Sequence, residues 1–430
     1  MCEWKRPGIR AIAAALLIGL ISLFTQGLYA QFRVEAQFRN RFEFRDGYKK
    51  LSEKGSEPAA FISQRTRISF GFESERLKLR FTPQDVRVWG DEKASSATGV
   101  YGDSASLDLF EAFVQIKIGD NGWLSVGRQP LVYDGQRLLA ARNWNQNGLS
   151  YDAVVYKWKS QAWEFHAGNS WNSTGENASD NFYNPSRIKS LNFLWAKHQV
   201  TSQWSLSLSH IASGVTPSAN SNKLWFRQTS GVYTTYVGER VQTTGNLYYQ
   251  FGKNTSRNRV NAWLFDADIA YKAESMTPGI GVSYLSGNHT LNGNTDRLFD
   301  VLYGARHRVF GDMDYFSNFG PHTKQGGLAE LYVYLDFRLG NNTRLKNTGH
   351  YFRLAQNNES TPNKKNLGYE NDLVLKHNFQ DWGSLECGYA FFLPTRSLKS
   401  IQNVPETKHS QFFYLQLTLS PVLFRSNESR

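Results

Sequence analysis

The sequence has almost no cysteine and only one long run of apolar residues. Its two cysteines are Cys2 and Cys387, and removal of the N-terminus would leave the second alone, so no internal disulfide could form. Beyond the N-terminal run, no segment reaches the roughly 20 consecutive apolar residues that a membrane-spanning helix needs. The nine histidines show no metal-binding spacing, and no nucleotide-binding loop is present. These absences argue against a disulfide-stabilised scaffold and a helical membrane protein, and we expect no cofactor and no catalytic site.

The N-terminus is typical of a secretory signal peptide. Three basic residues within the first ten positions precede an apolar run, Ala11–Phe24, and a small residue, Ala30, ends the segment. The run is too short to cross a bilayer comfortably, which disfavours the alternative of an N-terminal membrane anchor. We predict that residues 1–30 are removed and that residues 31–430 form one exported domain. Removal takes away three basic groups and one acidic group, so the net charge falls from +12 to +10.

The composition suits a protein that crosses a membrane with strands. Aromatic residues make up 14% of the chain, although the mean hydropathy is negative, at −0.50. A polar, aromatic-rich chain without apolar helices is typical of a transmembrane β-barrel, in which lipid-facing and lumen-facing residues alternate. A large periplasmic β-sandwich could share this composition, so the strand pattern has to separate the two.

The segment Phe32–Phe44 shows the alternation most clearly. Its even-numbered positions are nearly all apolar, and its odd-numbered positions are nearly all charged. A period of two places these sets on opposite faces of a strand. The pattern recurs to the end of the chain, for example in Phe110–Ile118, Trp263–Tyr271 and Leu331–Leu339. We therefore predict an all-β fold, a transmembrane antiparallel up-and-down β-barrel in the bacterial outer membrane.

The alternating runs also give an approximate strand count. There are roughly 18 of them, each of about ten residues, which is the length of a tilted membrane strand. Turn sequences such as Asp120-Asn121-Gly122 separate the runs. Two polar stretches, residues 171–187 and 287–325, are too long for tight turns. We expect long extracellular loops there, which could also fold into the lumen.

Arginine is the most informative charged residue. A charged side chain is costly on the lipid face near the midplane, so arginines on the polar face of a strand must point into the lumen or lie near an interface. They could form a solvated wall held by ion pairs, or a cationic path that attracts anions such as carboxylates. The arginines on the polar face of the first strands are Arg33, Arg39, Arg41, Arg45, Arg65, Arg67 and Arg80.

Three segments carry motifs beyond simple alternation. The first segment contains Gly127-Arg128-Gln129, Arg142-Asn143-Trp144 and Tyr151-Asp152-Ala153; the second runs from Phe299 to Tyr315; the third is Leu367–Leu373, followed by Gly388-Tyr389. In these motifs the chain resembles the alginate-export family of outer-membrane barrels, and the resemblance is ordered along nearly the whole expected domain.

The resemblance implies a single-chain barrel of about 18 strands whose narrow, basic lumen passes a polyuronate or a similar anionic chain. Carried over by motif, Arg128 and Arg142 would be lumen arginines, and Asp152 would orient them. Further lumen candidates, chosen by polar-face position or proximity to a motif, are Arg137, Arg65, Arg67, Arg306 and Arg353.

We therefore expect an outer-membrane channel that passes an anionic, alginate-like polysaccharide or oligosaccharide by passive diffusion. One alternative is a less selective porin for small anions or nutrients, and another is an outer-membrane hydrolase with Ser and His on different strands. Expected partners are outer-membrane lipid and lipopolysaccharide, the barrel-assembly machinery and the anionic solute. Nucleic acid is not expected, because the basic residues alternate along strands. The spacing of Asp312 and Asp314 suits a loop calcium site, although ordinary polar loop contacts are the alternative.

Overall fold

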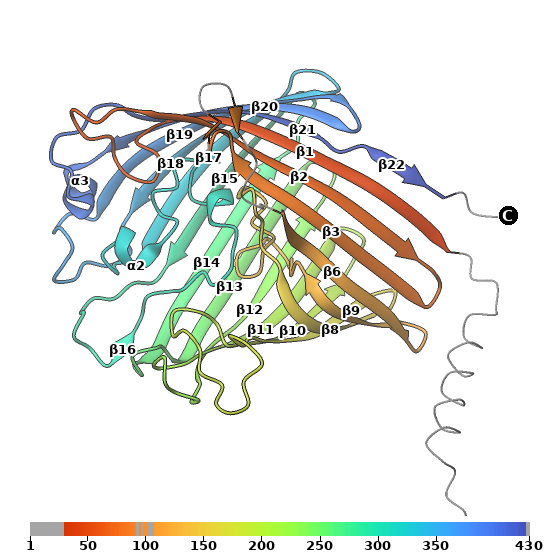
Figure 1. The fold of residues 1–430 in the computed structure, drawn as a ribbon. Coiled ribbons are helices and arrows are strands. Elements are labelled where there is room, and N and C mark those ends of the chain that lie inside the picture. Colours follow the sequence, from red (N-terminus) through yellow and green to blue (C-terminus); the bar gives the residue numbers. More distant parts are fainter. Residues whose placement is uncertain (1–29, 92–93, 96–98, 101–106, 427–430) are drawn as a thin grey trace, which may run out of the picture.

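The computed structural model describes residues 30–91, 94–95, 99–100 and 107–426, which form a barrel of strands (Figure 1). The predicted signal peptide lies outside the described residues and stays a prediction. Among the described residues, no helix is long and apolar enough to cross a membrane.

Long strands form the barrel wall, and short elements lie in the connections. The wall strands are β1 (Gln31–Asp46), β2 (Ala59–Glu73), β3 (Leu77–Val88), β6 (Leu107–Ile118), β7 (Gly122–Gln129), β8 (Tyr151–Lys159), β9 (Trp163–Trp171), β10 (Ser190–Gln199), β11 (Trp204–Val215), β12 (Trp225–Val237), β13 (Val241–Lys253), β14 (Arg259–Tyr271), β15 (Met276–Leu285), β17 (Leu328–Arg338), β18 (Thr343–Arg353), β19 (Asn366–Gln380), β20 (Gly383–Pro394), β21 (Ser410–Leu419) and β22 (Val422–Arg425). The short elements are β4 (Ala94–Ser95), β5 (Gly99–Val100), β16 (Thr295–Asp296), η1 (Arg306–Arg308), α2 (Phe319–His322) and α3 (Arg396–Gln402).

The wall is a closed antiparallel barrel of 18 strands. Neighbouring wall strands pair in sequence order, and β1 pairs with β2 on one side and with both β21 and β22 on the other. The last two segments together complete one strand beside β1. The predicted fold class and strand number are confirmed.

The two faces of β1 show why this sequence forms a barrel wall. Arg41 points inward and is only 4% exposed, whereas its neighbour Phe42 is 36% exposed on the outer face. In β11 the buried Ser207 and the exposed Leu208 repeat the arrangement. Apolar side chains thus cover the lipid-facing surface. Closure of the ring pairs the backbone polar groups of every strand, as a bilayer requires.

The two ends of the barrel differ in the length of their connections. At the end that holds both termini of the barrel, consecutive strands are joined by turns of two to four residues, such as 74–76 and 381–382. At the other end the connections are longer, and they reach 21 residues at 130–150 and 42 residues at 286–327. Short turns face the periplasm and long loops face outward in outer-membrane barrels.

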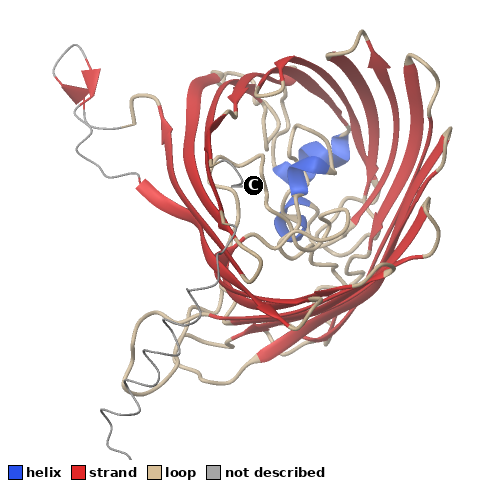
Figure 2. Cartoon of the chain, turned by 90° about the vertical axis from the view of Figure 1, so that its right-hand side faces the viewer, coloured by secondary structure: helices blue, strands red, loops and turns tan. Residues whose placement is uncertain are grey.

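The two longest connections fold back into the lumen, where loops and helices lie within the ring of strands (Figure 2). We name residues 130–150 the first plug loop and residues 286–327 the second plug loop. Leu139 of the first forms a parallel bridge with Tyr303 of the second. The interior is therefore packed with loop residues as well as wall residues. Buried apolar side chains from the plug loops are Leu131, Leu138, Leu139, Phe299, Val301, Phe310, Met313, Tyr315 and Phe316.

Candidate functional site

Two cavities lie in the lumen, one on each side of the plug loops. The outer cavity, toward the long loops, has a volume of about 560 Å³. The inner cavity, toward the short turns, has a volume of about 730 Å³. Arg306 lines the outer cavity, whereas the next two residues of η1, His307 and Arg308, line the inner one. The plug loops thus lie between the two cavities, and we call this part of the lumen the septum.

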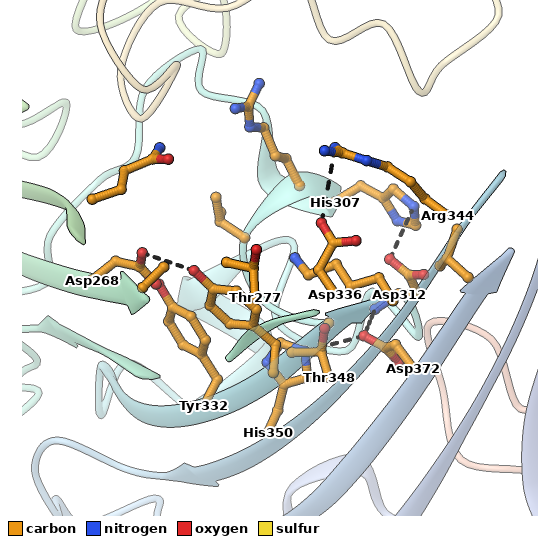
Figure 3. Close-up of a pocket in the computed structure, with 18 of the residues that line it drawn as sticks. Asp268, Thr277, His307, Asp312, Tyr332, Asp336, Arg344, Thr348, His350 and Asp372 are labelled. Carbon is orange, nitrogen blue, oxygen red and sulfur yellow. Dashed lines mark hydrogen bonds and ion pairs between the residues drawn. The ribbon is translucent and has the colours of Figure 1, made fainter. Parts of the chain in front are cut away.

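The inner cavity is lined by more basic than acidic side chains. Figure 3 shows part of this lining, with Arg344 beside Asp336. Tyr332 and Tyr334 both donate hydrogen bonds to Asp268, at 3.0 and 3.1 Å. Arg344 lies 3.9 Å from Asp336, and its side chain is 63% exposed, so this pair is solvated. Asp268 and Asp336 thus each have a polar or basic neighbour. The basic side chains that line the cavity still outnumber its carboxylates. The basic residues are Arg137, Lys272, Arg308, Arg338, Arg344 and Lys346, and the carboxylates are Asp268, Asp312, Asp336 and Asp372.

The outer cavity has a stronger basic excess. Arg187, Arg227, Lys253 and Arg306 line it together with one carboxylate, Asp300. Arg227 also forms an ion pair at 2.9 Å with the second plug loop, through a carboxylate outside the cavity lining. Low-dielectric walls concentrate the field of such groups.

The arginines of β1 and β2 hold the first plug loop. Arg39 donates to the side chain of Gln146 at 2.8 Å and to the carbonyl oxygen of Asn143 at 2.7 Å. Arg65 donates to the carbonyl oxygen of Gln146 at 3.2 Å and to the side chain of Asn143 at 3.0 Å. Arg67 donates to a further loop carbonyl at 3.1 Å. Arg65 and Arg67 do face the lumen, but their guanidinium groups bind the protein itself.

Arg41 completes this group of inward arginines. It donates to the carbonyl oxygen of Trp144 at 2.9 Å, and its guanidinium carbon lies 3.8 Å from the centre of that ring. The first plug loop thus presents a series of carbonyl oxygens to a series of cations. Charged donors make stronger hydrogen bonds than neutral ones, so this contact fixes the loop firmly.

The predicted site residues within the plug loops are Arg137, Arg142 and Arg306, and each donates hydrogen bonds to another part of the protein. Arg142 donates to the carbonyl oxygens of Leu302 and Tyr303, both at 3.1 Å, and thereby joins the two loops. Arg137 forms a 2.5 Å ion pair with Asp266 of β14. Arg306 donates to a carbonyl of its own loop at 2.6 Å. All three lie inside the lumen, and two of them also line a cavity.

Arg128 and Asp152 lie outside the lumen, so the prediction for this pair is wrong. They form a bidentate ion pair with both distances 2.9 Å. Arg128 lies on the face of β7 that carries the exposed Val126, and Asp152 lies on the face of β8 that carries the exposed Val154. Strand alternation thus places the pair on the outer face, where both strands meet the first plug loop. A charge near the interface costs little.

Arg353 is also outside the lumen. It shares a face of β18 with Tyr351, which pairs in register with the exposed Leu331 of β17. The residue lies at the long-loop end of the strand and is exposed. The prediction that it lines the path is therefore wrong, because proximity to a motif does not override strand alternation.

Asp312 and Asp314 lie on two sides of one histidine ring. The nearest oxygens lie 3.6 Å (Asp312) and 3.1 Å (Asp314) from the nitrogens of His307, which stacks on Trp144 with ring centres 3.8 Å apart. Burial and the neighbouring carboxylate of Asp372 raise the pKa of Asp312 to about 7. Burial alone would lower the pKa of His307, but the two aspartates raise it above its ordinary value.

This arrangement gives the calcium expectation no support. Asp314 accepts hydrogen bonds from His307 and from the hydroxyl of Tyr48. Across the described residues, no group of three or more His, Cys, Asp or Glu side chains is placed to hold a metal ion. The two aspartates instead form part of a network of titratable groups around the second plug loop.

Apart from Arg137, sequence reasoning did not single out the basic residues of the inner cavity. Arg338 belongs to an alternating run, and the same strand alternation places Arg344 and Lys346 on the inward face of β18. That signal was available but did not distinguish them from other charged residues. Arg308 lies in a loop without periodicity, so no local pattern could have placed it.

A serine–histidine pair from different strands does occur. The Nδ1 atom of His210 on β11 lies 2.8 Å from the hydroxyl of Ser230 on β12. The two residues are register partners on the face that carries Leu208 and Val232, both exposed. The pair therefore faces the lipid and lies away from both cavities.

The closed barrel, the unequal ends and the divided lumen define an outer-membrane channel of the porin class. Its fold is similar to that of Pseudomonas aeruginosa OccK9 (OpdG), with a TM-score of 0.62 at 11% identity over 91% of this chain and 98% of that one. OpdL of the same organism gives 0.60 at 13% identity, covering 91% and 99%. OpdK, crystallised with vanillate, gives 0.59 at 10% identity, covering 91% and 98%.

The particular family follows from the sequence. A family model described as alginate export matches residues 30–394, so the chain belongs to the alginate export family. Comparison with curated protein sequences gave no significant match. Family and fold together place the protein in the bacterial outer membrane and make it a transport channel.

Proposed function

We propose that this channel passes carboxylate-bearing solutes, uronate oligosaccharides first among them, by passive diffusion and without catalysis. The observation that carries the proposal is the excess of basic side chains in both cavities. The inner cavity has six basic groups and four carboxylates, and the outer cavity has four and one. Such an excess raises the local concentration of anions within a low-dielectric wall.

A row of cations on the inner-cavity wall could pass a carboxylate along by weak contacts. Arg338 on β17 and Arg344 on β18 are register partners near the periplasmic turn, and Lys346 is the next inward residue of β18. Arg308 of the septum also lines this cavity. Several weak sites suit conduction better than one strong site, because a bound solute must also leave.

Family membership supports a uronate solute, and the geometry limits its size. The plug loops lie between two spaces of about 730 and 560 Å³, so we expect a polymer chain to pass only if these loops move. A short oligosaccharide needs a smaller movement. We therefore favour oligosaccharides over the intact polysaccharide.

The second candidate is a channel for small anions. It is supported by the same division of the lumen and by the fold shared with OpdK, which was crystallised with vanillate, a small aromatic carboxylate. A solute of that size fits within either cavity. The basic groups would then give only a preference for anions.

Planar-bilayer recordings would separate these candidates. Uronate oligomers added to one side should interrupt the chloride current in resolvable events, and neutral oligosaccharides of equal length should not. If vanillate-sized carboxylates block equally well, the small-anion candidate is favoured. A current that no anionic solute affects would contradict both.

A further inference from the structure

We infer that the second plug loop is a pH-sensitive latch, closed against the wall at mildly acidic pH and released as the pH rises. The inference depends on the channel fold and not on the identity of the solute. It rests on how the turn after Phe310 meets the wall strands β17, β18 and β19.

Two backbone N–H groups of the loop dock on two wall carboxylates. The N–H of Asp312 donates to Asp372 at 3.1 Å, and the N–H of Met313 donates to Glu370 at 2.7 Å. Gly311 permits this approach, since its φ is +79° and a Cβ there would lie 2.3 Å from the Glu370 carboxylate. The docked turn also forms part of the inner-cavity wall.

Titratable side chains surround this contact. His307 lies between the loop aspartates, and His350 on β18 lies between Glu330 at 2.7 Å and Asp372 at 3.1 Å. Two imidazoles therefore stand among five carboxylates, namely Asp312, Asp314, Glu330, Glu370 and Asp372.

The wall carboxylates are almost completely buried. Glu330 is 4% exposed, Glu370 0% and Asp372 6%, and each has one oxygen without a hydrogen-bond partner. Buried carboxylates without enough partners are costly when ionised. The docked loop therefore requires protons within the cluster.

Other charged and titratable groups face the cluster from the remaining neighbours. They are Arg41 of β1, Tyr48 and Lys49 of the β1–β2 loop, Tyr414 of β21, and Arg137 and Asp266, which act on Glu330. Arg41 disfavours a charged His307, whereas Lys49 favours an ionised Asp314. Neither of these two groups offsets the repulsion between the carboxylates of Asp312 and Asp372.

The sign of the pH effect follows from the loop groups. The pKa of Asp312 in the docked loop is raised to about 7, so its contribution to docking is lost as the pH rises toward that value. The pKa of His307 is also raised, so its contribution is lost at still higher pH, above its ordinary 6.5. The pKa of Asp314 is lowered, because His307 and Tyr48 outweigh the effect of burial, and its contribution is lost only under strongly acidic conditions. Docking of the second plug loop therefore weakens between pH 3.8 and about pH 7, where Asp312 loses its proton, and it weakens further above pH 6.5, where His307 loses its proton.

Single-channel recording from about pH 5 to pH 9 tests the latch. We expect the open fraction to rise with pH by up to about tenfold per unit for each group that loses its proton. Asp312→Asn should stay closed to higher pH and flatten the profile. The matched control is Asp381→Asn, in the exposed β19–β20 turn, which should leave the profile unchanged.

A second measurement follows the loop directly in folded barrels, identified by their heat-modifiable migration on gels. Met313 is fully buried behind the docked turn, so a Met313→Cys variant in a Cys387→Ser background should react with an impermeant maleimide faster at high pH. Its rate is normalised to that of Asn341→Cys in an exposed turn. A flat conductance profile, an unchanged profile in Asp312→Asn, or a normalised rate independent of pH would each overturn the latch.

Discussion

Two parts of the inner wall hold the two plug loops by opposite chemistry. On β1 and β2, arginines such as Arg39 and Arg65 donate hydrogen bonds to carbonyl oxygens of the first plug loop. On β19, the carboxylates of Glu370 and Asp372 accept hydrogen bonds from N–H groups of the second. Each wall carries the charge that matches the backbone groups facing it.

The comparison shows that charge inside a barrel serves two separate purposes. The densest arginine cluster fixes a loop, so its guanidinium groups are already occupied. The basic residues that line the two cavities lie elsewhere, on β12, β13, β17 and β18, in turns and in the plug loops themselves. Counting inward arginines therefore does not distinguish those that hold a loop from those that line a cavity.

Removal of an arginine from the β1–β2 wall should have the largest effect. Arg39→Ala loses charge-assisted bonds to Asn143 and Gln146, which should loosen the first plug loop by about 3 kcal/mol. Conductance and current noise should rise, and proteases should cut within residues 130–150. Arg80→Ala is the matched control, because Arg80 pairs with Glu35 and Glu111 of the wall. Equal effects of both variants would remove the distinction between loop-holding and wall-pairing arginines.

Removal of a carboxylate from the other wall should have a smaller effect. Glu370→Ala leaves the N–H of Met313 buried without an acceptor, at a cost of about 2 kcal/mol to docking of the second plug loop. Glu370→Gln retains an acceptor and should restore most of the docking. Limited proteolysis of residues 286–327, compared among the three proteins, measures this. If the alanine variant resists proteolysis like the parent, the carboxylate wall does not hold the loop.

Charge reversal in the inner cavity should change selectivity without loosening either loop. Arg344→Glu combined with Lys346→Glu inverts two solvated cations that line the cavity. We expect the ratio of chloride to potassium permeability to fall by roughly threefold, because the field in the cavity changes sign locally. The reversal potential in a salt gradient reports this change. An unaltered ratio would show that ions do not pass this wall.

Loss of the ion pair between Arg128 and Asp152 on the outer face should have the smallest effect. Arg128→Ala removes a partly exposed pair with Asp152, worth less than about 1 kcal/mol. Conductance, selectivity and the temperature of barrel unfolding should all stay close to those of the parent. A large loss of anion preference would show that Arg128 lies on the solute path.

The barrel could be predicted from sequence because strand alternation is a local signal. Alternation with its nearest neighbours determines which face of the wall each side chain occupies, as Arg41 and Phe42 show. The same rule already placed Arg128 on the face of Val126, and the prediction failed because the motif was given more weight than the alternation.

The site could be predicted only in part, because it depends on contacts between distant segments. Nothing near Arg142 in sequence shows that it joins the two plug loops, since its acceptors lie about 160 positions away. Gly311 lies within the second motif, which marked it as a residue of interest. The reason a glycine is needed there, its close approach to Glu370, is visible only in the folded structure, where the loop meets β19.

The most direct test of the account is the zero-current potential of the purified channel in a potassium chloride gradient. Both cavities are lined by more basic than acidic side chains. The account therefore predicts a potential of the sign set by chloride, reduced in the Arg344→Glu, Lys346→Glu variant. A potential of the sign set by potassium in the parent protein would contradict it.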